Sequence, residues 1–273
     1  MPRGVGLNWV YDEARLQGRL WTPSLLPPSL LSLWLDADDP STITIATGVS
    51  EWRDKSRNGN NAIQATGSFQ PSYSATAFPG NLPGVLFDGI DDIMDVSTTA
   101  MRNTTHGVYW AFSRTSITGL GDAYRPMIGI LTSSGDRGAL HYVKTNNLGA
   151  SYPYFVPSSQ FYDNLGPVYE NGTGYVMAFQ NNTTGWGVWR NGTLEGTTNG
   201  PGIPNNVDRG YSLGGQYSFA RRIHGVLAEM IMLESTNTTV RVLIEGYLAW
   251  KRGLQSRLIL THPFVNRPPL IGD

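Results

Sequence analysis

Residues 223–263 read IHGVLAEMIMLESTNTTVRVLIEGYLAWKRGLQSRLILTHP, and this stretch decides the fold. Residues 225–233 form a short apolar run that contains one charge, Glu229. Such a run is typical of a strand that is buried on most of both faces, although its pattern alone also fits a helix.

The second part of the stretch carries a helical stripe that is apolar except at its last member: Val240, Leu243, Ile244, Tyr247, Leu248 and Lys251. This spacing places the side chains on one helix face. Polar residues at 235–239 offer N-caps, and Gly253 stands where a left-handed C-cap residue is needed. Lys251 and Arg252 fall in the last turn, where the helix dipole favours positive charge. We predict a core strand followed by one C-terminal amphipathic helix.

The composition suits a folded β protein. With 273 residues, of which 40% are hydrophobic and 15% charged, the chain can form one large β domain with appendages or two small domains. Its 32 glycines indicate many short strands joined by tight turns. A net charge of −1 gives no electrostatic footprint for nucleic acid. The absence of cysteine excludes disulfides, thiol catalysis and Cys-ligated zinc.

No signal peptide is visible, because the N-terminal segment carries several charged residues and lacks an uncharged apolar core. The apolar patch at 21–35 is interrupted by prolines and is too short to span a bilayer. We therefore expect a soluble protein that is made in the cytoplasm and does not insert into membranes.

Residues 1–30 have no clean hydrophobic period and combine scattered aromatic residues with a proline-rich end. They fit an arm that wraps its own domain or an arm that docks on a partner protein, because apolar residues without a period need a surface to bury against. For the second alternative the anchoring residues are Trp9, Tyr11 and Trp21.

Short apolar runs recur between residues 31 and 265. Residues 108–112 and 127–131 are predicted core strands, and Asn191-Gly192 predicts a hairpin turn. Residues 132–170 alternate weakly and are predicted to form long loops. Strands at short spacing, with no helix until the end, indicate an all-β fold: a two-sheet antiparallel sandwich. An extended tail at 266–273 follows.

Seven motifs occur in order along the chain: LWLDADDPSTI (33–43), EWRDKSRNGNNAIQ (51–64), LPGVLFDGIDDIM (82–94), VWRNGT (188–193), HGVLAEMIMLES (224–235), IEGYLAWKRGL (244–254) and HPF (262–264). In this order they resemble the concanavalin A-like, laminin-G-type jelly-roll domains found in bacteriophage virion proteins and some bacterial surface proteins. The resemblance covers residues 31–265. It implies a lectin-type sandwich whose relatives often contact glycans or partner proteins.

The acidic residues do not form an evident catalytic pair. Glucanases on this fold use two carboxylates that face one glycosidic bond. The nearest candidates, Glu229 and Glu234, have an odd separation and would point to opposite faces of a regular strand. Metalloprotease, P-loop, dinucleotide and nucleophile-elbow motifs do not occur. We therefore expect no catalytic residues and no enzymatic activity.

Two acidic clusters offer the oxygen ligands that Ca²⁺ prefers, and aspartate is also the default residue of turns and caps. The cluster members are Asp36, Asp38, Asp39, Asp88, Asp91 and Asp92. EF-hand spacing is absent, so the turn role is favoured. We expect no obligatory cofactor and keep Ca²⁺ as an alternative.

Aromatic residues in predicted loops or at strand edges are candidate ligand contacts, because aromatic faces stack on sugars and anchor protein interfaces. These candidates for glycan or partner binding are Tyr152, Tyr154, Phe155, Tyr162 and Trp186. The tryptophans in predicted strands or in the helix are expected in the core: Trp52, Trp110, Trp189 and Trp250.

These features favour a bacteriophage virion structural protein of the capsid-decoration or tail-fibre type. It would display the lectin-like sandwich for particle assembly or for adsorption to host-surface polysaccharide. The arm would bind other virion proteins, and the chain is expected to be a homo-oligomer in the assembled particle. The alternatives are a free carbohydrate-binding lectin module and a glycoside hydrolase.

Overall fold

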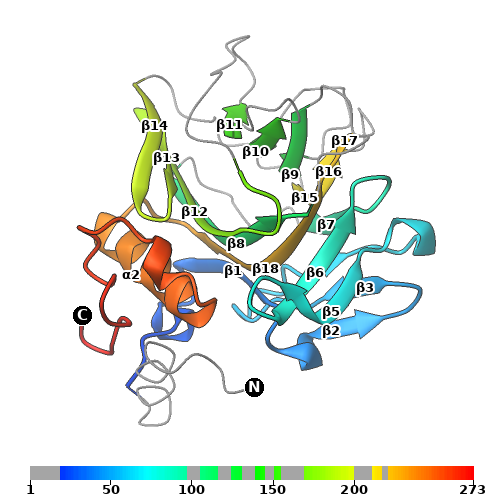
Figure 1. The fold of residues 1–273 in the computed structure, drawn as a ribbon, viewed down its shortest axis with the longest axis horizontal. Helices are drawn as coiled ribbons and strands as arrows, with labels where there is room; N and C mark the ends of the chain where they lie inside the picture. Colours follow the sequence, from blue (N-terminus) through cyan, green and yellow to red (C-terminus); the bar gives the residue numbers. More distant parts are fainter. Residues whose placement is uncertain are drawn as a thin grey trace.

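The computed structural model describes residues 19–96, 105–115, 124–130, 139–144, 151–154, 169–199, 211–216 and 221–273. These residues form two large antiparallel sheets and one α-helix (Figure 1). The predicted two-sheet sandwich with a C-terminal helix is therefore confirmed. Within the described ranges, no helix is both long enough and apolar enough to cross a membrane.

The first sheet, sheet 1, is built around β18 (His224–Leu233). One side of β18 pairs with β8, and the other side pairs first with β6 and then with β1. Both faces of β18 are covered, one by the core between the sheets and the other by the core beneath the C-terminal helix, which explains why the strand is a nearly continuous apolar run. On the β8 side of β18 the strands are, from the edge inward, β14 (Thr193–Asn199), β13 (Gly185–Arg190), β12 (Gly174–Asn182) and β8 (His106–Arg114). On its other side lie β6 (Leu82–Asp88) and then β5 (Ser72–Phe78), while β1 (Leu31–Asp36) pairs with the second half of β18.

The second sheet, sheet 2, consists of shorter strands. In spatial order they are β11 (Ser151–Tyr154), β10 (Ala139–Lys144), β9 (Tyr124–Ile130), β15 (Tyr211–Leu213), β7 (Met94–Val96), β4 (Ala62–Ile63), β3 (Val49–Trp52) and β2 (Ile43–Ile45). A separate ribbon joins β16 (Gly215–Gln216) to β17 (Arg221–Arg222). The prediction of long loops at 132–170 was wrong for β10 and β11, whose pairings contain register shifts that blur the sequence alternation.

Short 3-10 helices connect some of these strands: η1 (Pro23–Leu25), η2 (Pro40–Thr42), η3 (Gly67–Phe69) and η5 (Gln255–Arg257). The hairpin between β13 and β14 turns at Asn191 and Gly192, whose φ angles are 50° and 81°. Positive φ at both central residues defines a type I′ turn, so the predicted hairpin is confirmed.

The main core lies between the two sheets. It contains Trp52 of sheet 2 and Trp110 of sheet 1, both with no exposed surface, as predicted. Side chains at alternate positions of each strand face this core, as in other sandwiches.

The other face of sheet 1 is covered by helix α2 (Thr238–Lys251), visible beside β12, β13 and β1 in Figure 1. The predicted helix is confirmed. The Asn237 side chain accepts a hydrogen bond from the Val240 N–H at 3.1 Å and caps its start. Gly253 has φ 67° just beyond its end. Apolar residues from α2, sheet 1 and the C-terminal segment form a second core there.

Polar side chains, rather than another strand, cover the second edge of β1. The Trp34 N–H donates to the Asp54 carboxylate at 2.9 Å, and the Lys55 N–H donates to the Trp34 carbonyl at 2.8 Å. The Asn60 amide donates to the Ser32 carbonyl at 2.7 Å. The motif at 51–64 therefore satisfies backbone groups that a bare edge strand would leave open to pairing.

The first described residues pack on the sandwich. Leu20 and Leu270 form a β-bridge, and the Trp21 N–H donates to the Pro269 carbonyl at 3.1 Å. Trp21 is 6% exposed, and its ring lies edge-on to Tyr247 at 6.0 Å. Trp21 thus fixes the chain to its own domain and does not offer its ring to a partner, contrary to the anchoring role that we assigned to it. Trp9 and Tyr11 lie outside the described residues.

Gly246 allows α2 and the C-terminal segment to approach closely. A Cβ atom at this position would lie 2.7–2.9 Å from atoms of Phe264. We predict that Gly246→Ala lowers the free energy of unfolding by about 1–2 kcal/mol, because overpacking outweighs the gain of about 1 kcal/mol in helix propensity. Urea unfolding measures the change. A stabilised variant would show that the segment moves aside without cost.

Candidate functional site

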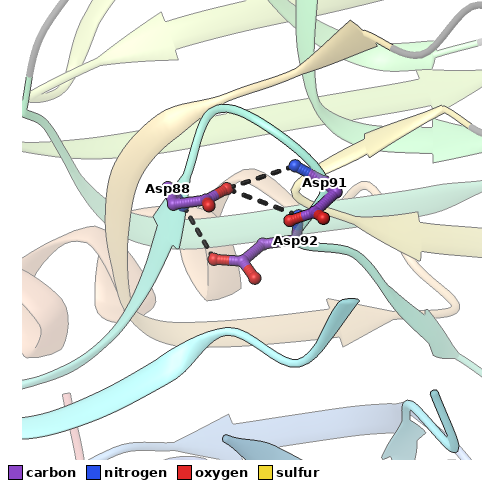
Figure 2. A group of neighbouring side chains, drawn as sticks. All are labelled: Asp88, Asp91 and Asp92. Atoms are coloured by element: carbon purple, nitrogen blue, oxygen red, sulfur yellow. Dashed lines mark hydrogen bonds between the residues drawn. The ribbon is translucent and has the colours of Figure 1, made fainter. Parts of the chain in front are cut away.

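The loop after β6 brings three carboxylates together (Figure 2). Asp88, Asp91 and Asp92 each offer an oxygen atom, and these atoms lie within 4.8 Å of one another. The Asp88 carboxylate accepts the backbone N–H groups of Ile90 at 2.8 Å and Asp91 at 3.3 Å. The Asp92 carboxylate accepts the Asp88 N–H at 2.8 Å. The cluster is therefore both a hydrogen-bonded turn and the group among the described residues with the geometry to hold a metal ion.

The electrostatics of the loop centre on Asp92, which is 7% exposed. Burial raises the pKa of its carboxyl, the negative charges of Asp88 and Asp91 add to the rise, and the pKa reaches about 7. A cation would relieve this repulsion. Ca²⁺ takes six to eight oxygen ligands, so the three carboxylates would supply part of its shell. Binding of Ca²⁺ at this loop stays a prediction.

The raised pKa of Asp92 predicts a pH-dependent stability in the absence of divalent cations. The unfolded carboxyl ionises near pH 4, whereas the folded one holds its proton to about pH 7, so stability falls as the pH rises between these values. Asp92→Asn keeps the acceptor for the Asp88 N–H and removes the ionisation. In EDTA, we expect the variant to match the parent at pH 4 and to exceed its free energy of unfolding by about 2 kcal/mol at pH 8. Urea unfolding at the two pH values measures this, and an equal difference at both would contradict it.

Glu229 occupies a different environment, on the side of β18 that faces α2. The register between β18 and β8 shifts between Leu227 and Glu229. This bulge places Ala228 and Glu229 on the same side, because side chains otherwise alternate along a strand. Leu227 and Met230, which flank the pair, both belong to the core between the sheets.

The Glu229 carboxylate is fully buried and binds four donors. One oxygen accepts the Trp34 indole N–H and the Tyr247 hydroxyl, each at 2.8 Å. The other accepts the Lys251 ammonium and the Arg252 guanidinium, each at 2.8 Å. Charge-assisted bonds of this kind stabilise a buried carboxylate. Glu229 therefore joins β1, β18 and α2. Because its carboxylate is buried and bound by these donors, it does not form a catalytic pair with Glu234.

Asp36 belongs to the same network. Its carboxylate binds Lys251 at 2.7 Å, Lys55 at 2.9 Å and Arg252 at 3.3 Å. Burial alone would raise the pKa of the Asp36 carboxyl, but the three positive charges outweigh it and hold the pKa well below its usual range. Arg252 is itself fully buried and carries its charge among these carboxylates.

The other members of the first acidic cluster are also paired with cations. Asp38 binds Arg252 at 2.7 Å, and Asp39 binds Lys55 at 3.2 Å. Asp36, Asp38 and Asp39 therefore neutralise cations of the protein itself. Among the described residues, the group that could hold a metal ion consists of Asp88, Asp91 and Asp92 and does not include them. The sequence contained a signal for this network. Glu229 is a charge in an otherwise apolar strand and needs a partner when buried, and Lys251 and Arg252 are two adjacent cations at the end of the helix.

The aromatic candidates fall into three groups. Trp186 is 6% exposed in β13 and packs against Phe179 with the ring centres 6.5 Å apart, so it is a core residue and was wrongly expected at the surface. Tyr152 and Tyr154 lie in β11. Phe155 and Tyr162 lie outside the described residues. Of the tryptophans expected in the core, Trp250 is buried and Trp189 is partly buried against α2.

No protein-family model matches the sequence, and no curated protein matches it either. The fold, however, is similar to solved structures. A sialidase from Trypanosoma rangeli matches with a TM-score of 0.56 at 11% identity, over 85% of this chain and 36% of that one. Domain 4 of AbnA, a GH43 extracellular arabinanase from Geobacillus stearothermophilus solved in complex with arabinotriose, matches with a TM-score of 0.53 at 14% identity, over 77% of this chain and 95% of that one. The binding domain of Paraclostridial Mosquitocidal Protein 1 matches with a TM-score of 0.51 at 8% identity, over 78% and 51%.

The similarity defines the class of fold: a β-sandwich that also occurs in a sialidase, in a domain of an arabinanase and in the binding domain of a mosquitocidal protein. The chain spans about a third of the length of the sialidase chains that it matches. Our expectation that the chain is not an enzyme is corrected by this finding. Two of the similar structures are a sialidase and a domain of an arabinanase, so this fold occurs in glycoside hydrolases and gives no ground for excluding an enzyme.

Proposed function

We propose that the chain is a carbohydrate-binding β-sandwich domain that a bacteriophage particle displays to adsorb to glycans on the host surface. One observation carries the carbohydrate part of this proposal. The chain matches domain 4 of the arabinanase over 95% of that domain, and that domain is solved with a bound arabinotriose. A match over nearly a whole domain supports a shared module more than a match to part of a larger enzyme does.

The virion part rests on the ordered motifs of residues 31–265, which resemble domains of phage particles. In this proposal the segment before Arg19 binds other virion proteins, and several copies of the chain assemble on the particle. The described chain begins beside the C-terminal segment, where Leu20 pairs with Leu270.

A glycan array tests carbohydrate binding. The purified chain is applied, with Ca²⁺ and with EDTA, to arabinotriose, sialylated oligosaccharides and purified bacterial surface polysaccharides. Saturable binding to one class supports the proposal, and binding that disappears in EDTA assigns Ca²⁺ a role in it. The same incubations are assayed for released reducing sugar, which would identify a glycoside hydrolase. An array without any saturable ligand would contradict the proposal.

Deletion of residues 1–18 tests attachment to the particle. This deletion spares Leu20 and Trp21, which pack on the sandwich, so the domain should stay folded. We expect particles assembled with the deletion variant to lack the protein, while the variant keeps the melting temperature of the parent. Normal incorporation would contradict an attachment role for the segment.

A further inference from the structure

Trp189 of β13 lies on the face of sheet 1 that α2 covers. Val188 belongs to the core between the sheets, so Trp189, the next residue, is on the opposite face, where it packs against the second core. Its cross-strand partner is Leu194 of β14, the last strand of the sheet, and Leu194 is 51% exposed. Residues directly opposite on neighbouring strands share a face. The partly buried Trp189 and the exposed Leu194 therefore lie side by side at the border between the second core and solvent.

The indole ring of Trp189 is fixed by contacts with its own strand and with α2. Gly187 leaves room for the ring, since a Cβ atom there would lie 2.5–3.2 Å from three of its carbon atoms. The guanidinium carbon of Arg241, near the start of α2, is 4.3 Å from the centre of the ring. An arginine placed over a tryptophan face is attracted to it. The ring and the guanidinium are therefore held together before any ligand binds.

Both side chains carry hydrogen-bond donors without an acceptor. Within the described part of the chain, the Trp189 indole N–H makes no hydrogen bond, and its nitrogen is not among the buried atoms that lack a partner, so it is open to solvent. Arg241 is 9% exposed, and its Nη1 binds the Glu245 carboxylate at 2.8 and 2.9 Å. Its Nε is buried without a partner, and its Nη2 is unpaired but open to solvent. An acceptor on a ligand would satisfy donors from β13 and α2 together.

We propose that Trp189, Arg241 and Leu194 form the site at which the chain binds a carboxylate-bearing saccharide. The inference rests on the proposed carbohydrate-binding function and gives it a place in the fold. The carboxylate accepts hydrogen bonds from the indole N–H and from Nη2 of the guanidinium, and such charge-assisted bonds are stronger than neutral ones. The apolar side of the sugar ring packs on Leu194 and on the exposed edge of the indole. Because Glu245 already balances the charge of Arg241, recognition depends on these short-range contacts rather than on long-range attraction.

The first test compares saccharides that differ in charge. The full chain is titrated with sialylated oligosaccharides and acidic bacterial surface polysaccharides, and with neutral arabinotriose. The acidic class is expected to bind about ten-fold more tightly or better, since a hydrogen bond to a charged group supplies that difference. Trp189→Phe keeps an aromatic ring beside Gly187 and removes the N–H, so it is expected to weaken binding of the acidic class about ten-fold. Preference for the neutral saccharide would contradict carboxylate recognition.

The second test places opposite charges at Leu194. This residue is 51% exposed, so a glutamate and a lysine disturb the fold to a similar, small extent. Leu194→Glu sets a negative charge beside the ligand carboxylate and is expected to weaken binding about ten-fold, whereas Leu194→Lys is expected to keep the affinity of the parent or to raise it up to about three-fold. Equal weakening by both variants would contradict a carboxylate at this position.

Ile45→Glu is the matched control, because Ile45 is 56% exposed and lies in β2, at the edge of the other sheet. It is expected to bind like the parent. Each variant is accepted only with the circular dichroism spectrum and melting temperature of the parent. If the parent binds an acidic saccharide and both Trp189→Phe and Leu194→Glu keep that affinity, this is not the binding site, while the proposed function stands. If the parent binds no glycan, both proposals fall.

Discussion

Glu229→Ala is expected to lower the free energy of unfolding by about 3–5 kcal/mol, which is the cost of leaving buried charges without their partner. Arg252 is fully buried and Lys251 is nearly so, and both bind the Glu229 carboxylate at 2.8 Å. Removing the carboxylate also leaves the Trp34 indole N–H and the Tyr247 hydroxyl without an acceptor. Total stability in small domains is about 5–15 kcal/mol, so this loss removes a large share of the stability of the Glu229→Ala variant.

Urea unfolding followed by tryptophan fluorescence measures this loss. Glu229→Gln is the informative second variant, because it keeps one oxygen acceptor and removes only the charge that faces Lys251 and Arg252. We expect it to lie between the parent and Glu229→Ala. Glu170→Ala is the control, since Glu170 is exposed and substitutions at such sites change stability by about 0.5 kcal/mol or less. A loss below about 1 kcal/mol for Glu229→Ala would show that the network does not hold α2 on sheet 1.

The features that sequence predicted correctly are local ones. The stripe and caps of α2 and the Asn191-Gly192 turn each depend on residues within one element, and each was confirmed. The two-sheet architecture followed from the spacing of many such signals. The C-terminal strand was also predictable, because burial of both its faces leaves a continuous apolar run in β18.

The features that sequence missed depend on pairing between distant strands. The bulge at Glu229 turns its carboxylate toward α2, and no pattern within β18 reveals an inserted residue. Trp186 and Val188, two positions apart on β13, both face the core. Which β13 positions face the core is set by the register of β13 with β12, and the sequence alone does not show that register. A candidate site on a sheet is therefore harder to predict from sequence than the sheet itself.

Phe264→Ala is expected to lower the free energy of unfolding by about 3–5 kcal/mol, as other removals of buried aromatic rings do. Phe264 is 4% exposed, and its carbonyl accepts the Trp250 indole N–H at 2.6 Å. The Arg267 guanidinium lies 5.2 Å from the centre of its ring. Leu260→Ala is the matched control in the same segment, because Leu260 is 88% exposed. A change within about 0.5 kcal/mol is expected for the control.

The contact between Phe264 and Gly246 makes the two substitutions interdependent. In the parent, a methyl group at Gly246 would meet the Phe264 ring at less than 3 Å, so Gly246→Ala destabilises the chain. With Phe264→Ala already in place the obstacle is gone, and alanine's helix propensity should make Gly246→Ala stabilising by up to about 1 kcal/mol. Urea unfolding of the two single variants and the double variant completes the cycle. If Gly246→Ala has the same effect in both backgrounds, its cost arises elsewhere, and the C-terminal segment is not packed against α2 through this pair.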